Sequence, residues 1–296
     1  ALRAGAELVN SLNPDSELWA SQPIWGHQLE FFDKVGIKIN HYRYYDQLNS
    51  VLDFDGMLED LKGMRPNDIF LVHGCCHNPT GQDLNLQQWQ ELANIVNQTG
   101  ALPFVDIAYQ GFGEGIEEDV AGPRLFAENV PQMLLTVSSS KSFGIYRERA
   151  GILSVIVASD DGTDIESVRL KLRDTVRQLY FMAPDHGAAV VHEILSTPEL
   201  EQLWRQELDE IRLHIIEMRR LLRLAIEKAN PDFDAEFIEH QHGMFSCLPI
   251  TAEEQELMEQ KHHIYMLPNA RMNVAAMNSK QSAILAEVFA EVRAAR

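Results

Sequence analysis

Residues 69–81, with the sequence IFLVHGCCHNPTG, join an apolar run to a loop of small and turn-forming residues. The run has the length and composition of a buried strand, and Asn-Pro-Thr-Gly favours a turn. An apolar run followed by polar residues recurs in PFVDIAYQG at 103–111 and in MLLTVSSSKSFG at 133–144. Apolar residues at helical spacing lie between the first two runs, at 86–97. This alternation of strands and helices predicts an α/β fold with a mostly parallel sheet.

The rest of the chain extends this pattern and then changes. We predict a further strand at 152–157 and helices at 55–62, with Asp53 as its cap, and at 165–180. Thr197 and Pro198 begin a long helix that ends near residue 229. Short strands at 235–238, 243–248, 265–267 and 272–274 then precede a final helix at 280–293. We therefore predict a large sheet domain at 1–210 and a smaller α+β domain at 211–296, with the long helix passing between them.

Composition narrows the class of protein. The 296 residues are 45% hydrophobic, enough to form the core of one large and one smaller domain. The net charge of -19, from 25 Lys+Arg against 44 Asp+Glu, argues against nucleic-acid or anionic-membrane partners. No run approaches the roughly 20 apolar residues of a membrane helix. Cys75, Cys76 and Cys247 are too few for a disulfide framework, so we predict buried thiols and a reducing, cytoplasmic location.

Each of the three strand-and-loop segments ends in residues that suit a ligand site, because ligands bind at the carboxyl ends of strands in open α/β sheets. Asn78 offers an amide donor, although its motif taken alone predicts only a turn. Asp106 ends an apolar strand, where a carboxylate needs a cationic partner or faces a site, or else caps a helix. Tyr109 follows three residues later. Lys141 follows three serines, where it is either an exposed turn residue or a nucleophilic amine with a lowered pKa.

Two residues beside Lys141 suit a phosphate group. Ser138 supplies a hydroxyl and Arg149 a planar guanidinium, which together can bind phosphate oxygens through point donors and a bidentate fork. We predict no metal site, because His73 and His77 could share one ion only on a helix, and here they flank the end of a strand.

Seven segments in this order resemble the aspartate/aromatic aminotransferase family, which binds pyridoxal 5'-phosphate (PLP) and has fold type I. They are HNPTG at 77–81, DIAYQGF at 106–112, SSSK at 138–141, YRERAG at 146–151, PDHGAAVV at 184–191, GMFS at 243–246 and ARMNVA at 270–275. The resemblance extends from Ala1 to the end of the chain. It implies a homodimer that exchanges amino groups between an amino acid and a 2-oxo acid.

The resemblance also implies a role for each site residue. Lys141 would hold PLP as a Schiff base and move the proton at the substrate Cα. Asp106 would pair with the pyridine nitrogen, Asn78 and Tyr109 would contact the ring oxygen, and Trp25 would stack on the ring. Ser138 and Arg149 would hold the phosphate. Arg271 would bind the substrate α-carboxylate, and Arg177 would bind the side-chain carboxylate in the partner subunit's site.

Substrate choice rests on one segment. Met182 and Asp185, in Met-x-Pro-Asp-His-Gly, resemble the branch of the family that accepts aromatic substrates, whereas the aspartate-restricted branch tends to have Asn and Ala there. We therefore expect both aromatic and acidic amino acids to be used with 2-oxoglutarate. An aspartate-restricted enzyme is the alternative. A PLP lyase or decarboxylase is disfavoured by the two arginines.

Some positions depart from the family pattern. Gln28 stands where a His would support the pyridine-binding Asp, and Ala270 replaces a Gly beside Arg271. The family's Gly/Ser-rich phosphate loop should immediately precede Ala1, and we expect this chain to lack that N-terminal segment. A catalytically inactive fragment, serving as a folding or interaction unit, is therefore a second hypothesis from another class.

Overall fold

The computed structural model describes residues 1–158, 162–267 and 269–294. Its centre is a six-stranded sheet in the order β2-β1-β5-β6-β7-β8, in which every pairing is parallel except that of β7 with β8. The predicted mostly parallel sheet is therefore confirmed. A short antiparallel pair, β3 and β4, stands apart from it. The strands are β1 (Leu18–Gln22), β2 (Ile39–Arg43), β3 (Tyr45–Asp46), β4 (Val51–Leu52), β5 (Ile69–His73), β6 (Leu102–Ile107), β7 (Gln132–Ser138) and β8 (Gly151–Val157).

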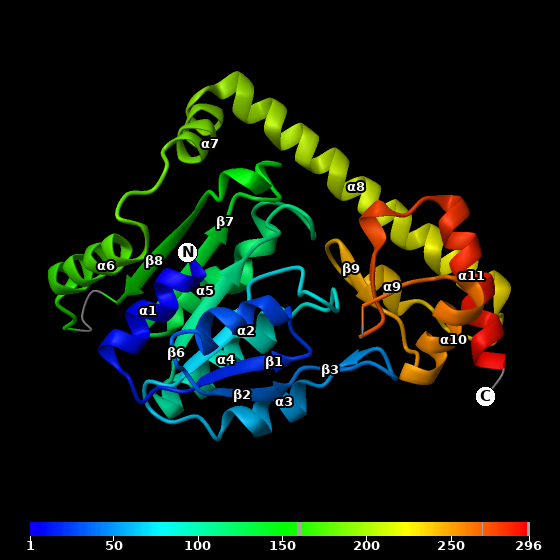
Figure 1. Ribbon diagram of the computed structural model, residues 1–296, viewed down its shortest axis with the longest axis horizontal. Coiled ribbons are helices and arrows are strands. Elements are labelled where there is room, and N and C mark those ends of the chain that lie inside the picture. The colour runs from blue at the N-terminus through cyan, green and yellow to red at the C-terminus, as the bar shows by residue number, and fades with distance from the viewer. Residues whose placement is uncertain (159–161, 268, 295–296) are drawn as a thin grey trace.

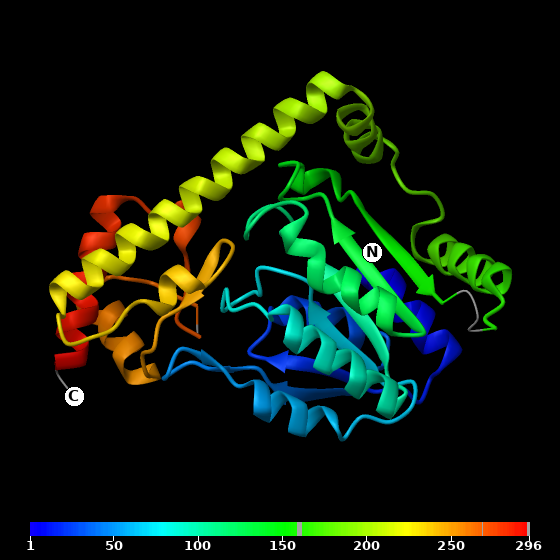
Figure 2. The same ribbon diagram turned by 180° about the vertical axis from the view of Figure 1, so that it is seen from behind.

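Helices cover both faces of the large sheet (Figures 1 and 2). One face carries α1 (Leu2–Leu12) and α2 (Gly26–Asp33), and α6 (Ile165–Tyr180) packs on α1. The other face carries α3 (Phe54–Leu61), α4 (Leu86–Thr99) and α5 (Ala121–Asn129). Alternate residues of β5 supply the two cores, because successive strand side chains point to opposite faces. Phe70 packs with Phe126 of α5, whereas Leu71 joins the cluster that contains Phe32 of α2.

The chain from the C-terminal half of α8 onward forms a second, smaller body. The long helix α8 extends from beside the sheet to this body, where its C-terminal half packs against α11 (Figure 1). A third apolar cluster lies here, formed by buried residues from 218 to 292. The division into domains at residue 210 falls within α8 and remains a prediction. α7 (His186–Ser196) lies near the end of the large sheet, where it lines a cavity with β7 and β8, and α8 (Pro198–Ala229) follows it (Figure 1). The smaller body contains α9 (Phe237–His240), β9 (Phe245–Cys247), α10 (Ala252–His262), β10 (Arg271–Asn273) and α11 (Ser279–Ala294).

Several predicted elements need correction. Residues 235–238 were expected to form a strand, but 237–240 form the helical turn α9, and 265–267 are not in a strand. β1 and β2 escaped prediction because β1 has only three consecutive apolar residues and β2 has no two in succession. α10 carries a signal that could have revealed it, since Thr251 and Glu254 form a capping box. Within the described ranges, none of the helices combines the length and apolar character that a membrane span requires.

Candidate active site

The site is built where β5, β6 and β7 end side by side. The register aligns Asp106 of β6 with His73 on one neighbour and with Thr136 on the other. Asp106 is only 7% exposed, and its two oxygens accept hydrogen bonds from Thr136 Oγ1 at 2.6 Å and from Gln28 Nε2 at 2.7 Å. Burial raises the pKa of Asp106, while the Thr136 hydroxyl and the positive charge of Lys141 act in the opposite direction. The carboxylate is thus desolvated, oriented and ready for a cationic partner.

Lys141 follows the end of β7 and is half-buried. Its Nζ lies 4.7 Å from the centroid of the Tyr109 ring and 5.5 Å from that of Tyr146. Burial lowers the pKa of Lys141, the nearby charge of Asp106 raises it, and that of Arg149 lowers it, with a net decrease. A lowered pKa favours the neutral amine, which is the nucleophilic form.

Five of the predicted residues line one crevice, namely Trp25, Asn78, Asp106, Tyr109 and Lys141. They come from the residue before α2, from the loop after β5, from β6 and the loop that follows it, and from the loop after β7. The enclosed part of the crevice is small, about 20 Å³. A ring-sized ligand would therefore have to lie across its mouth or widen it.

The two predicted phosphate ligands flank the lysine in the chain. Ser138 is the last residue of β7, and its Oγ accepts a hydrogen bond from the backbone N–H of Ser140. Arg149 is exposed, has a left-handed backbone conformation with φ of 54°, and donates to the carbonyl oxygen of Tyr146 at 2.9 Å. Its charge contributes to the lowered pKa of Lys141. A hydroxyl at residue 138 and a guanidinium at residue 149 thus lie in the chain segments before and after the amine.

Arg271 reaches the crevice from the smaller body. It begins β10, and its Nη1 donates to Asn78 Oδ1 at 2.9 Å across 193 residues of sequence. Its guanidinium lies 4.5 Å from the centroid of the Phe245 ring, which in turn packs edge-on against Tyr109. Ala270, before it, has a φ of 52°, a left-handed conformation that favours the Gly expected there.

Arg177 lies elsewhere in this subunit. It occupies the last turn of α6, its side chain is exposed, and it is not among the residues that line the crevice. The prediction assigned it to the partner subunit's site, so this position neither supports nor contradicts that role.

Sequence reasoning missed Arg219, which supports the loop under Arg271. This α8 residue is 2% exposed and donates to the carbonyl oxygens of Ile238, His242, Gly243 and Phe245 and to Ser246 Oγ, at 2.7 to 3.2 Å. Burial lowers its pKa to about 10. Helical spacing places Arg219 on the same face of α8 as Ile215, Leu222 and Ile226, which is a signal that could have marked it as buried, whereas its hydrogen-bond partners are visible only once the loop folds over it.

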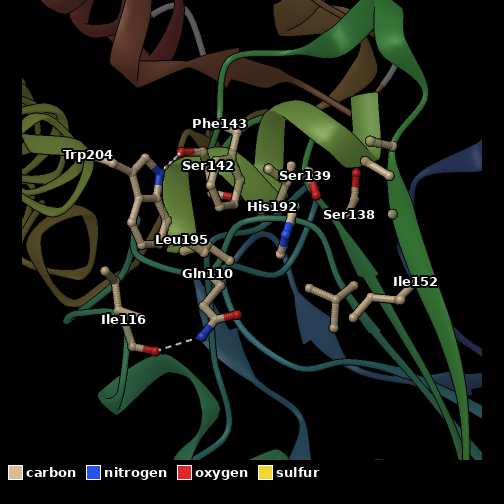
Figure 3. A pocket seen from close by; sticks show the side chains of 15 residues that line it. Gln110, Ile116, Ser138, Ser139, Ser142, Phe143, Ile152, His192, Leu195 and Trp204 are labelled. Carbon is tan, nitrogen blue, oxygen red and sulfur yellow. Dashed lines mark hydrogen bonds between the residues drawn. The ribbon is translucent and has the colours of Figure 1, made fainter. Parts of the chain in front are cut away.

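Trp204 was also missed, and it braces the lysine loop. Its Nε1 donates to the carbonyl oxygen of Ser142 at 2.7 Å, and its ring stacks on Phe143 with centroids 4.6 Å apart (Figure 3). The same side chains border a larger cavity of about 420 Å³ that reaches Ser138 and His192 (Figure 3). This cavity holds neither Lys141 nor Asp106, so we place the chemistry in the smaller crevice.

Among the described residues, Cys75, Cys76 and Asp119 come nearest to a metal-binding arrangement, with ligand atoms within 4.8 Å of one another. The Asp119 oxygens, however, already accept hydrogen bonds from four backbone N–H groups of residues 111–115. Burial raises the pKa of Cys76 well above its ordinary value. Asp119 therefore holds the loop after β6 through hydrogen bonds, and its oxygens are not available to bind a cation.

The donor set around the crevice fits the predicted cofactor. PLP presents an aldehyde, a pyridine nitrogen, a ring oxygen and a phosphate. The chain offers an amine with a lowered pKa at Lys141, a buried carboxylate at Asp106, and the amide and phenol of Asn78 and Tyr109. The serine and arginine described above complete the set.

Comparison with known proteins gives a consistent result. The sequence model described as aminotransferase class I and II matches residues 1–289. An aromatic-amino-acid aminotransferase of Paracoccus denitrificans is 40% identical over 292 residues, covering 99% of this chain and 74% of that protein. An aspartate aminotransferase of Pseudomonas aeruginosa is 39% identical over 296 residues, covering 99% and 73%. The crystal structure of an aromatic-amino-acid aminotransferase from Burkholderia pseudomallei, covalently bound to pyridoxal phosphate, matches with a TM-score of 0.93 and 40% identity over 98% of this chain and 72% of that chain.

Proposed function

The chain belongs to the class I and II aminotransferases, with PLP as cofactor, and on that premise we propose that it transfers the amino group of aromatic and acidic amino acids to a 2-oxo acid such as 2-oxoglutarate. The observation that carries the proposal is the meeting of Lys141, Asp106 and Arg271 around Asn78 and Tyr109. An amine, a carboxylate and a carboxylate-binding cation are the groups that amino-group exchange requires.

We assign the cofactor to the residues of the crevice. Asp106 would hold a proton on the pyridine nitrogen, because a desolvated carboxylate gains most from a cationic partner. Asn78 and Tyr109 would donate to the ring oxygen, and Trp25 would cover the ring. Ser138 and Arg149 would bind the phosphate. When bound, the protonated ring supplies an electron sink for negative charge at the substrate Cα.

Lys141 would do two things in this assignment. Its neutral amine would hold the cofactor covalently, and the same amine would take and return the proton at the substrate Cα. Its lowered pKa supports both roles, because each needs an unprotonated nitrogen near neutral pH.

Substrate binding would depend on two arginines. Arg271 would bind the α-carboxylate that all amino-acid substrates share, through the guanidinium face that Asn78 leaves free. Arg177 of the partner subunit would bind the second carboxylate of acidic substrates. The relatives are named for aromatic amino acids and for aspartate, which supports dual use.

Reconstitution with PLP tests the proposal. The purified chain should bind PLP, sodium borohydride should then fix the cofactor to Lys141, and peptide mass spectrometry should locate the added mass. The loaded protein should convert phenylalanine and aspartate with 2-oxoglutarate. Lys141→Ala should bind PLP without a borohydride-stable bond and should lose turnover.

Two alternatives predict different results in the same experiment. A catalytically inactive fragment would fold and bind PLP weakly or not at all, with no turnover of either substrate. An aspartate-restricted enzyme would convert aspartate but not phenylalanine. If the protein transferred the amino group of phenylalanine and of aspartate, and Lys141→Ala did neither, both alternatives would be ruled out.

We also propose a homodimer in the cytoplasm. Apolar side chains stay exposed around the end of α6, with Tyr180 at 52%, Phe181 at 73% and Met182 at 78% exposure, and they lie close to Arg177 in the chain. An interface there would cover them and bring Arg177 toward a second crevice. The three free cysteines support a reducing compartment. Light scattering coupled to size exclusion would test the dimer.

A further inference from the structure

Gln28 lies between two polar residues of the site. It is in α2, its side chain is fully buried with 0% exposure, and its amide spans from β5 to β6. Its Nε2 is 2.7 Å from Asp106 Oδ2, and its Oε1 is 2.7 Å from His73 Nε2. The other ring nitrogen of His73, Nδ1, lies 3.3 Å from the backbone N–H of Asn78.

These contacts determine which atom donates at each step. The backbone N–H of Asn78 can only donate, so His73 Nδ1 accepts and carries no proton. The proton of the neutral imidazole is then on Nε2, which donates to Gln28 Oε1. The opposite end of the amide is its NH2 group, which donates to Asp106 Oδ2, and a carboxylate only accepts. If the amide of Gln28 were turned round, its NH2 group would face the Nε2–H of His73, and its oxygen would face the carboxylate of Asp106. Neither pair could form a hydrogen bond.

We infer that Gln28 is a positioning residue, through which a one-way series of hydrogen bonds from Asn78 and His73 is directed at the carboxylate of Asp106. Hydrogen bonds in such a series polarise one another, so each strengthens the next. The series begins at the backbone N–H of Asn78, whose side-chain oxygen accepts a hydrogen bond from Arg271. It ends at the carboxylate of Asp106, the residue that we propose binds the pyridine nitrogen. It therefore links the residue that would bind the ring oxygen to the residue that would bind the ring nitrogen.

A glutamine suits this place because it has no proton to gain or lose near neutral pH. His73, which faces Lys141 and the ring of His77, is the titratable link, and burial together with the charge of Lys141 lowers its pKa to about 4. Both links stay neutral above that pH, so the direction of donation is constant. The family's usual His at position 28 would also offer one donor and one acceptor, but it can take a second proton, after which both of its ring nitrogens are donors.

The cofactor-free protein allows a direct test. Labelling with 15N-histidine and long-range 1H–15N correlation report which ring nitrogen of His73 carries the proton, with His73→Asn identifying the signals. We expect a protonated Nε2, a bare Nδ1 and a slowly exchanging Nε2 proton between about pH 6 and pH 8. Gln28→Met keeps the shape but removes the acceptor, so the Nε2 proton should lose its protection. Gln28→His should restore it. Gln241→Met, which removes a buried amide from the hydrogen bonds to Tyr45 and Ser246, is the matched control and should leave His73 unchanged.

Cofactor affinity supplies the second readout, which rests on the proposed function. The Gln28–Asp106 hydrogen bond is already present without cofactor, so its loss affects PLP binding only through the orientation and charge of Asp106, and Gln28→Met should weaken that binding about tenfold. Gln28→His and Gln241→Met should bind within a few-fold of wild type. A proton on His73 Nδ1, or an equally protected Nε2 proton in Gln28→Met, would overturn the series. Equal PLP affinities of Gln28→Met and wild type would overturn its effect on Asp106. If wild type bound no PLP, the proposed function would fail, and the nitrogen assignments would still decide on Gln28.

Discussion

Asp106→Asn should separate stability from cofactor binding. The substitution keeps the shape of the side chain and removes its charge. In the wild type both oxygens accept hydrogen bonds, from Thr136 and Gln28. An amide has one oxygen, which can keep the hydrogen bond from Gln28. Its NH2 group then faces Thr136, whose hydroxyl can turn to accept from it and to donate to the carbonyl oxygen of Val105, 3.5 Å away.

The effect on folding is the balance of two contributions. Burial raises the pKa of Asp106 above its ordinary value, so the ionised carboxylate destabilises the cofactor-free fold at neutral pH. That cost is present above the folded-state pKa and is lost as pH falls through it. Removing the charge removes the cost, whereas exchanging two hydrogen bonds to a charged carboxylate for weaker ones to a neutral amide costs about 1–3 kcal/mol. We expect the free energy of unfolding at pH 7 to stay within about 2 kcal/mol of wild type.

The substitution should only weaken the binding of PLP. The variant loses a charge-assisted hydrogen bond to the pyridine nitrogen, worth about 1.5–3 kcal/mol, which weakens binding by about 10-fold to 150-fold. Urea unfolding of the cofactor-free protein measures the first quantity, and titration followed by the absorbance of bound PLP measures the second. Single-turnover transfer should also slow, because an amide does not hold the ring proton by charge.

Asp68→Asn is the matched control, because Asp68 is a buried carboxylate with the opposite balance. Burial would raise its pKa, but hydrogen bonds from Arg65 and from backbone N–H groups lower it, so the ionised form stabilises the fold at pH 7. Asp68→Asn should lower the free energy of unfolding by about 1–3 kcal/mol and leave PLP affinity unchanged. If Asp106→Asn behaved like this control, losing stability and keeping affinity, the assignment of Asp106 to the pyridine nitrogen would be wrong.

Three further predictions follow from the site and its surroundings. Arg177→Ala should lower kcat/KM for aspartate by an amount equivalent to about 2–4 kcal/mol of transition-state stabilisation and should hardly change kcat/KM for phenylalanine. Equal losses of kcat/KM for the two substrates would show that Arg177 does not bind the side-chain carboxylate. Arg219→Met should lower the free energy of unfolding in urea by about 3–5 kcal/mol, because the carbonyl oxygens of the loop under Arg271 lose their donor. It should also raise KM for both substrates, and an unchanged KM would show that Arg219 contributes to stability alone. Because the pKa of His73 falls from 6.5 to about 4 on folding, the unfolded state binds more protons between those values and stability should decrease as pH falls from about 6.5. His73→Asn should flatten that slope by up to about 1.4 kcal/mol per pH unit, and an unchanged slope would contradict the buried, neutral state of His73.

Local sequence was sufficient where the physical cause is local. α6 and α8 begin and end at the predicted residues, and Asp53 caps α3 by accepting from the backbone N–H of Gly56. Apolar runs of strand length predicted β5 to β8, because those strands are buried or pack against a helix layer. The residues at the ends of these strands were predictable as a site, since parallel strands bring their carboxyl ends to one edge.

The sequence could not supply the pairing of residues that are distant in the chain. Thr136 meets Asp106 only through the register of β6 and β7, and Gln28 reaches it only because α2 packs over that edge. Helical spacing puts Arg219 on the buried face of α8, but the carbonyl oxygens to which it donates belong to the loop at 238–246 and are known only from the fold.

The division follows from the range of the interactions. Capping, helical periodicity and the chemistry of Lys141 or Asp106 are set by residues a few positions apart, so the amino-acid sequence by itself determined the elements and the reactive groups. The desolvation that shifts the pKa values of those groups comes from packing between elements that are far apart in the chain. The direction of the hydrogen bonds from His73 through Gln28 to Asp106 likewise needs three elements in contact, and only the tertiary structure decided it.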